Sequence, residues 1–412
     1  MKLHRSLTDA VVTTLQEIFV NKRQADRAIE YILKSNKKWG ARDRGFIAEN
    51  TYEIVRWWRL LTFVIDAPSA IEDLERTHFY HCLGAWLLLK ERHAGYEASL
   101  RTLPEWTEFE SLDVKAMDER YEEARQTRKI IESIPDWMDE LCEKELGTAW
   151  DKELMAMNEP APVVLRANTI KTNRLYLQDL LEEEEIESSI NNEAPDAVIL
   201  RGRPNVFKTE FFKEGFFEVQ DTGSQLIAPF LDVQPGMRVI DACAGAGGKT
   251  LHLAALMQNK GRIISMDVEE RKLLELQKRA KRAGATNIET KLIEGKTIKR
   301  LQDSADRLLL DVPCSGLGVL RRNPDAKWKI TPEFIDNLRL VQWDILSRYS
   351  AMLKKGGKMV FATCSILPSE SENHVQRLLA EQPDKWELLK EHRTSPAEDG
   401  YDGFYMACLL KK

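Results

Sequence analysis

Two cysteines, each followed by a serine, are the residues of this sequence best suited to covalent chemistry. Cys314 lies in the segment DVPCS at 311–315, and Cys364 lies in the segment TCS at 363–365. A cysteine thiolate is a nucleophile that can form a transient bond with a substrate. A lone cysteine is most often a buried structural residue, but two in matching positions favour a functional pair.

A glycine-rich turn offers a place for a nucleotide-like ligand. The segment VIDACAGAGGKT at 239–250 predicts a strand, a turn and then a helix. Glycines let the backbone approach a ligand, and the helix N-terminus directs N–H groups toward it. A phosphate-binding P-loop also ends in GKT, but its first glycine would have to stand at position 243, which is Cys243. The turn therefore indicates a nucleotide-like ligand and argues against a P-loop.

An aspartate follows the next predicted strand. Asp267 lies roughly 20 residues beyond the glycine-rich turn, where an acid can accept hydrogen bonds from ribose hydroxyls. A dinucleotide-binding oxidoreductase would share this feature, although it would leave the paired cysteines unexplained. Asp267 can also cap the helix expected to begin near Glu269, and the two roles are compatible.

All these motifs follow strands of one alternating pattern. From about residue 225, strands are predicted at 238–242, 262–266, 288–293, 307–310 and 358–363, and helices at 249–257 and 269–283. A long helix is expected to begin at Thr331-Pro332 and to end at Gly356-Gly357. This alternation predicts a doubly wound parallel sheet. Ligands bind such sheets beyond the carboxyl ends of the strands, so the motifs should surround one crevice.

The rest of the chain predicts two further domains. Residues 1–150 carry apolar residues at helical spacing and several tryptophans, which indicates a helical domain. Residues 151–225 combine short strands at 163–165 and 197–200 with a helix at 175–184, as expected of a small α+β unit. The α/β catalytic domain would then occupy residues 226–412.

Composition and charge narrow the classes of function. The 412 residues are 43% hydrophobic and 31% charged, and the longest apolar run, at 82–89, is too short to span a membrane. The N-terminus lacks the apolar stretch of a secretory signal, so a cytoplasmic location is expected. The six cysteines form no CxxC pair, which argues against a zinc site and a disulfide framework. The net charge of −6 permits RNA binding only through local basic clusters, such as 278–282 and 327–329.

Taken together, the motifs resemble those of the Sun/RsmB-type RNA cytosine-5 methyltransferases. The combined pattern DxCAxxGGKT, DxPCSGxG and TCSxxP is highly specific, and the resemblance covers the chain from about residue 160 to residue 412. The segment RANT at 166–169, the pair Gln220-Asp221 and the closing DGFY at 402–405 also resemble family segments. Residues 25–61, with Asp43-Arg44 and Arg56, resemble the helical NusB-like domain of bacterial members.

The resemblance implies a Rossmann-like S-adenosylmethionine methyltransferase domain, preceded by a small RNA-recognition-like α+β subdomain and an all-helical NusB-like domain. It implies that Cys364 attacks carbon 6 of cytosine, that Cys314 assists proton removal at carbon 5, and that Asp311 binds the edge of the base. The residues expected to bind the cofactor are Cys243, Ala244, Gly245, Ala246, Gly247, Gly248, Lys249, Asp267 and Asp311. The residues expected to bind RNA are Arg166, Asn168, Arg321, Arg322 and Lys327.

Two positions depart from the family pattern. Ala246 replaces a proline in the glycine-rich turn, and Lys296, two residues after Glu294, replaces an acid that reaches the adenine of the cofactor. DNA cytosine-5 methyltransferases use the cysteine of the Pro-Cys motif, which makes Cys314 the alternative nucleophile. The expected substrate is 16S ribosomal RNA, with transfer RNA, or a non-catalytic RNA-binding role in ribosome assembly, as alternatives. We expect a monomer that binds neither a metal nor a membrane.

Overall fold

The structure is a computed structural model that describes residues 3–95 and 103–412. Contacts divide the chain into two units: the described residues up to Lys144 together with Arg322–Ile330, and Glu145–Arg321 together with Thr331–Lys412. The sequence-based boundaries near residues 150 and 225 remain a prediction. No helix within the described ranges is long and apolar enough to cross a membrane.

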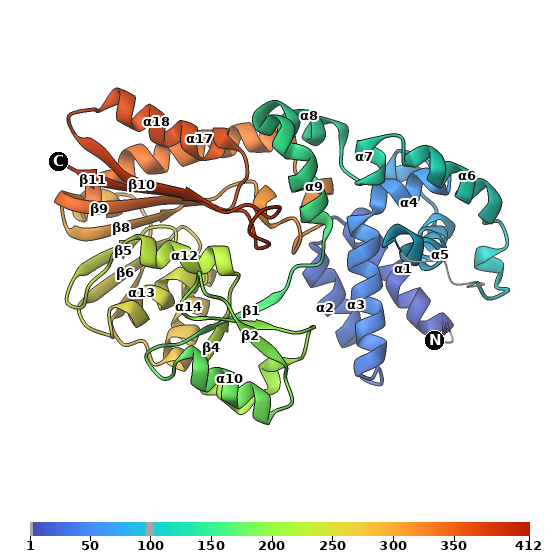
Figure 1. The fold of residues 1–412 in the computed structure, drawn as a ribbon, viewed down its shortest axis with the longest axis horizontal. Coiled ribbons are helices and arrows are strands. Elements are labelled where there is room, and N and C mark those ends of the chain that lie inside the picture. The colour runs from blue at the N-terminus through green and yellow to red at the C-terminus, as the bar shows by residue number, and fades with distance from the viewer. Residues whose placement is uncertain (1–2, 96–102) are drawn as a thin grey trace. The chain divides into compact units, whose positions relative to one another are not determined.

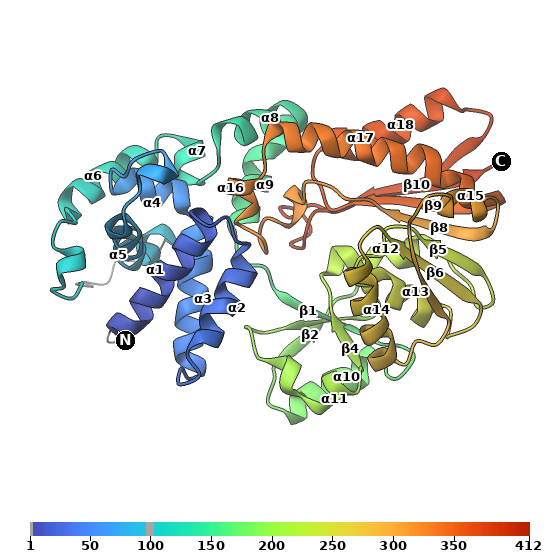
Figure 2. The same ribbon diagram turned by 180° about the vertical axis from the view of Figure 1, so that it is seen from behind.

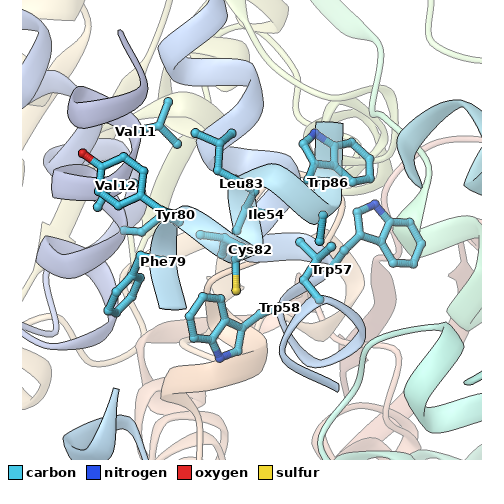
Figure 3. Packing of buried hydrophobic residues seen from close by; sticks show 14 of the residues in the cluster. Val11, Val12, Ile54, Trp57, Trp58, Phe79, Tyr80, Cys82, Leu83 and Trp86 are labelled. Atoms are coloured by element: carbon cyan, nitrogen blue, oxygen red, sulfur yellow. The ribbon is translucent and has the colours of Figure 1, made fainter. Parts of the chain in front are cut away.

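The first unit is built of helices in its described residues (Figures 1 and 2). Its helices are α1 (Arg5–Phe19), α2 (Ala25–Ser35), α3 (Ala41–Arg56), α4 (Trp58–Val64), α5 (Arg76–His93), α6 (Val114–Ala124), α7 (Arg128–Ile131), α16 (Ala326–Lys329) and the start of α8 (Asp136–Leu146). Their apolar faces form one core, in which Phe19 stacks on Trp58 with ring centroids 3.8 Å apart. Figure 3 shows this core around the buried thiol of Cys82. The predicted helical region is thus confirmed.

A small antiparallel sheet belongs to the second unit, which begins with the end of α8 and α9 (Trp150–Asn158). The strands β1 (Val163–Ala167), β2 (Ser188–Ile190), β3 (Ala197–Leu200) and β4 (Phe217–Val219) pair in the order β2-β3-β1-β4. Helices α10 (Arg174–Glu183) and α11 (Glu210–Lys213) cover the sheet through Leu177, Leu181 and Phe211. Strands β1 and β3 and helix α10 match the prediction, whereas β2 and β4, at three residues each, are too short to give a sequence pattern.

The second unit also contains a seven-stranded sheet. Its strands are β5 (Arg238–Asp241), β6 (Arg262–Asp267), β7 (Ile288–Leu292), β8 (Ala305–Asp311), β9 (Leu353–Thr363), β10 (Trp386–Arg393) and β11 (Tyr405–Lys411), in the order β10-β11-β9-β8-β5-β6-β7. Strands β5 to β9 are parallel, and β10 and β11 pair antiparallel at one edge. The chain passes from β5 to β6 on one side and returns to β8 on the other, so the loops after β5 and β8 diverge and leave a crevice.

Alternate residues of the central strands face two layers of helices. Leu308 and Leu310 of β8 pack in a core with α17 (Pro332–Tyr349) and α18 (Glu372–Glu381). Leu309 packs in the opposite core with α12 (Thr222–Phe230) and α13 (Gly248–Leu256). Figure 1 shows these two pairs of helices on opposite sides of the sheet, with α14 (Glu270–Ala283) beside α13. The short helix α15 (Thr297–Arg300) follows β7 in the chain. The doubly wound α/β architecture is confirmed, with two antiparallel strands added.

The long helix α17 begins as predicted and ends earlier. Thr331 caps it by accepting a hydrogen bond from Phe334 N, and Pro332 is its first residue. The helix ends at Tyr349, and β9 already begins at Leu353. The prediction that Gly356-Gly357 end the helix is wrong, because Gly356, at φ +76°, lies where the register between β8 and β9 shifts. A left-handed glycine occurs both after helices and in strand bulges, and the sequence pattern does not separate the two.

Candidate active site

The two cysteines lie side by side beyond adjacent parallel strands. Asp311, the last residue of β8, pairs with Ala362 of β9, so the loops that follow start together. Cys314 Sγ lies 3.1 Å from Cys364 Sγ, and Cys364 N donates a hydrogen bond to Cys314 Sγ at 3.2 Å. Both are free, partly exposed thiols. The structure therefore brings together the two residues selected by their sequence context.

The electrostatic surroundings of the two sulfurs differ. The hydrogen bond with Cys364, followed by burial, raises the pKa of Cys314 well above its ordinary value. The negative charge of Glu370 acts in the same direction. A negative charge on the Cys364 sulfur is one of the effects that raise the pKa of Lys249. The Lys249 ammonium and the Cys364 sulfur are therefore close enough to attract each other. Cys314 is thus held as a thiol, and a Cys364 thiolate would have a cation close to it.

Lys249 joins the glycine-rich turn to the end of β8. Its Nζ donates a hydrogen bond to Asp311 Oδ2 at 2.6 Å. Burial would lower the pKa of Lys249, but the charge and the hydrogen bond of Asp311 outweigh burial and raise it. Lys249 therefore remains an ammonium ion between the turn and the cysteine loops.

The glycine-rich turn takes its shape from a glycine and an aspartate. Gly247, just before α13, has φ +91°, and a Cβ there would lie 2.5 Å from Leu276 Cγ. The carboxylate of Asp267 accepts hydrogen bonds from Gly245 N and Glu269 N, both at 2.9 Å. Asp267 thus fixes the turn and the backbone that leads into α14, but the N-cap of that helix is Glu269, so the capping role expected of Asp267 is not the one seen.

Two arginines hold the turn from outside. Arg166 Nη1 donates to Gly248 O at 2.6 Å and also hydrogen-bonds Gln220. Arg279, on α14, donates to Ala246 O at 2.9 Å. Sequence reasoning expected Arg166 to bind RNA and missed Arg279, whose only signal is its place in the basic run 278–282.

A cavity of about 330 Å³ lies at the carboxyl ends of β5 and β8, lined by the glycine-rich turn with Asp241, Lys249, Arg279 and Asp311. Burial raises the pKa of Asp241 to about 7, although Thr250 Oγ1 donates to its Oδ2 at 2.7 Å. Its Oδ1 makes no hydrogen bond of normal geometry with the described residues. A buried carboxylate oxygen beside a cavity is suited to accept a hydrogen bond from a ligand.

Four residues expected to bind RNA are buried: Arg166, Asn168, Arg321 and Lys327. Asn168 Nδ2 donates to Gly215 O at 2.7 Å and to Ala283 O at 2.8 Å. Arg321 Nη1 donates to Gly400 O at 2.7 Å. In this structure these side chains are closed to solvent and bind backbone carbonyls, so they have structural roles here, and their contacts with RNA remain a prediction. Arg322 is only half-buried, and its role remains a prediction.

Lys327 has a structural place in the helical unit. Its Nζ donates to Ser133 O at 3.1 Å and to Arg56 O at 3.3 Å. Burial, followed by the charge of Arg56, lowers the pKa of Lys327 to about 7. Only 1% of Lys327 is exposed, so the structure shows a structural role for it, and the RNA contact remains a prediction.

Comparison with known proteins identifies the family. The family described as 16S rRNA methyltransferase RsmB/F matches residues 228–410, and the ferredoxin-like domain of RsmF/B-like methyltransferases matches residues 134–207. A protein of Synechocystis named probable ribosomal RNA small subunit methyltransferase B is 32% identical, covering 90% of this chain and 91% of that protein. The chain belongs to the RsmB/F methyltransferase family. The ribosomal RNA small subunit methyltransferase B of Klebsiella pneumoniae (strain ATCC 700721 / MGH 78578) is 30% identical, covering 91% of this methyltransferase and 92% of that protein.

Solved structures agree with the fold of this methyltransferase. The crystal structure of PH0851 has a TM-score of 0.81 and 22% identity, and covers 100% of both chains. A methyltransferase homolog from Pyrococcus horikoshii has a TM-score of 0.62 and 27% identity, covering 69% of this chain and 98% of that one. NSun6 from the same organism, solved with the S-adenosylmethionine analogue SFG, has a TM-score of 0.63 and 21% identity, covering 68% and 99%. The Rossmann-like methyltransferase fold inferred from the motifs is thereby confirmed.

Proposed function

We propose that this member of the RsmB/F family transfers a methyl group from S-adenosylmethionine to carbon 5 of a cytosine in 16S ribosomal RNA, through a transient bond from Cys364 to carbon 6. The observation that carries the proposal is the 3.1 Å approach of the Cys314 and Cys364 sulfurs, with the Lys249 ammonium within electrostatic reach. The names of the relatives support the ribosomal substrate.

The residues around the cavity fit S-adenosylmethionine, which when bound supplies a methyl group on a positively charged sulfur. The backbone of residues 243–249 would hold it through N–H groups at the start of α13. The buried Asp241 keeps Oδ1 available as an acceptor beside the cavity. Asp267 would act mainly by fixing Gly245 in the turn.

Cys364 would act first, because an added thiolate makes carbon 5 of the base nucleophilic. As its sulfur bonds to carbon 6, the electrons of the C5=C6 bond form a C4=C5 bond and those of C4=N3 move onto ring nitrogen 3, which takes a proton from solvent. Asp311, with the ammonium of Lys249 behind it, favours this protonation. Carbon 5 then takes the methyl group. Nitrogen 3 then returns its proton to solvent, and removal of the proton from carbon 5 restores the C5=C6 double bond and expels Cys364 as a thiolate.

The contact between the sulfurs would time the action of Cys314. Its raised pKa depends first on the hydrogen bond with Cys364. Once Cys364 is bonded to carbon, its sulfur no longer carries charge, so the pKa of Cys314 falls and Cys314 can release its proton to solvent. The resulting thiolate is then available to remove the proton from carbon 5. The two cysteines would therefore ionise in sequence.

Transfer of labelled methyl groups to 16S rRNA, followed by bisulfite sequencing, tests the proposal. Wild type should protect one cytosine from conversion, and Cys364→Ala should give no transfer. Cys314→Ala should instead accumulate a covalent RNA–protein adduct that survives denaturation. Cys82→Ala, a thiol buried in the helical unit, is the matched control and should keep transfer. Adduct in Cys364→Ala and none in Cys314→Ala would reverse the assignment.

A further inference from the structure

A buried carboxylate joins both cysteine loops from behind. Glu370 has 0% of its surface exposed. Its Oε1 accepts hydrogen bonds from Ser315 N and from Gln342 Nε2, both at 2.9 Å. Its Oε2 accepts from Ser315 Oγ and Ser365 Oγ, both at 2.5 Å. Four donors thus converge on one side chain, from the loop after β8, the loop after β9 and helix α17.

The bonding pattern is that of an ionised carboxylate. All four partners donate, and each oxygen of Glu370 accepts two hydrogen bonds. An ionised carboxylate can accept all four, whereas in a protonated carboxyl one oxygen carries a hydrogen and accepts less well. A buried carboxylate is strongly unfavourable unless it is satisfied in this way. Gln342 extends the network, because its Nε2 also donates to Pro313 O at 2.9 Å and its Oε1 lies 3.0 Å from His374 Nε2. Both carboxylate oxygens of Glu370 and both polar atoms of the Gln342 side chain therefore have hydrogen-bond partners.

The positions of the serines link this network to the chemistry. Ser315 and Ser365 directly follow the two cysteines, so one carboxylate fixes the residue after each sulfur. We propose that Glu370 is a positioning residue that clamps the two cysteine loops together and keeps the Cys314 and Cys364 sulfurs adjacent. Its importance for turnover rests on the proposed function, in which both sulfurs act on one base.

The charge of Glu370 has a second, separable effect. It adds to the hydrogen bond and the burial that raise the pKa of Cys314. Removal of the charge should therefore make Cys314 ionise at lower pH, and any loosening of its hydrogen bond with Cys364 would act in the same direction. Glu370→Asp keeps the charge on a side chain shorter by one methylene group. A fall in the pKa of Cys314 in this variant therefore reports the loosened clamp, and the additional fall in Glu370→Gln reports the lost charge.

Thiol alkylation tests the clamp without RNA or cofactor. Iodoacetamide labelling of the full-length protein across pH, read at each cysteine by mass spectrometry, gives a separate profile for Cys314. In Glu370→Gln the midpoint for Cys314 should move down by about 1 pH unit, and in Glu370→Asp, which keeps the charge, it should move down less. Glu381→Gln, a half-exposed carboxylate paired with Arg377 on α18, is the control and should shift nothing. The proposal would be overturned if the alkylation midpoint of Cys314 did not shift in folded Glu370→Gln. It would also be overturned if alkylation of Cys314 and Cys364 became faster by the same factor in both Glu370 variants.

Turnover supplies the second readout. Glu370→Gln should lower kcat about 100-fold, as expected for loss of alignment, with KM for RNA within about threefold of wild type. Should Glu370→Gln fail to fold, Ser365→Ala removes one donor while the carboxylate stays, and about a tenfold loss of kcat is expected. An unchanged kcat in Ser365→Ala would then overturn the clamp. Absence of methyl transfer by the wild type would count against the proposed function and leave the alkylation result standing.

Discussion

Gly318 offers a direct test of how closely the backbone packs around the cysteine pair. A Cβ at this position would lie 2.0 Å from Gly403 O and 2.9 Å from Cys364 O, whereas real Cβ contacts are essentially never shorter than 3.0 Å. Gly318 N donates to Cys364 O at 3.0 Å, and Gly403 N donates to Gly318 O at 2.8 Å. Alanine must therefore push the segments of residues 318 and 403 apart by about 1 Å and strain these hydrogen bonds.

The expected cost follows from that displacement. A shift of ~1 Å in a catalytic group lowers turnover about 100-fold, or about 2.7 kcal/mol of activation free energy. Overpacking of this kind also lowers the free energy of unfolding by about 1–3 kcal/mol. We expect both effects in Gly318→Ala, measured by labelled methyl transfer and by urea unfolding.

A second glycine provides the matched control. A Cβ at Gly45, inside helix α3, would meet nothing closer than Glu49 Oε1 at 3.9 Å. Gly45→Ala should raise the free energy of unfolding by about 0.5–1 kcal/mol, because alanine favours the helix, and should leave turnover unchanged. If Gly318→Ala had the kcat and stability of wild type, the close packing inferred around Cys364 would be refuted.

Three further substitutions probe separate parts of the site. Lys249→Met removes the cation paired with Asp311, so kcat should fall at least about 100-fold; a kcat within threefold of wild type would exclude that role. Arg166→Ala removes the bond that holds the glycine-rich turn, so calorimetry should show roughly tenfold weaker S-adenosylmethionine binding; unchanged affinity would count against it. The pKa of Lys327 is about 7 in the folded state and ordinarily 10.5, so between these values the unfolded chain binds more protons and stability rises with pH. Lys327→Met should flatten that rise in thermal unfolding, and an equal slope in both proteins would contradict the lowered pKa.

Local patterns predicted the framework of the site well. Strand periodicity and the glycine-rich turn located β5, β6 and β8, and the geometry of parallel strands predicted that the loops after β8 and β9 meet. The two cysteines are neighbours because of that topology, and the structure adds the 3.1 Å distance between their sulfurs. The antiparallel strands β10 and β11 were not predicted, because a strand at the end of such a sheet has no motif of its own.

The roles of buried charged residues were beyond sequence reasoning. Arg166 and Lys327 have the charge expected of RNA ligands, yet each binds backbone carbonyls far away in the sequence, at Gly248 and Ser133. Charge type does not reveal such partners, since burial is decided by tertiary packing. Glu370 was missed for the same reason: its four donors come from segments that only the fold brings together.

The most direct test of the mechanism is to locate the bond between protein and RNA. Cys314→Ala would be incubated with 16S rRNA and S-adenosylmethionine, digested with nuclease and trypsin, and analysed by mass spectrometry. We predict a methylated cytidine nucleotide attached to the peptide that contains Cys364. Attachment to any other residue, or methyl transfer by a Cys364→Ala variant, would contradict covalent catalysis by Cys364.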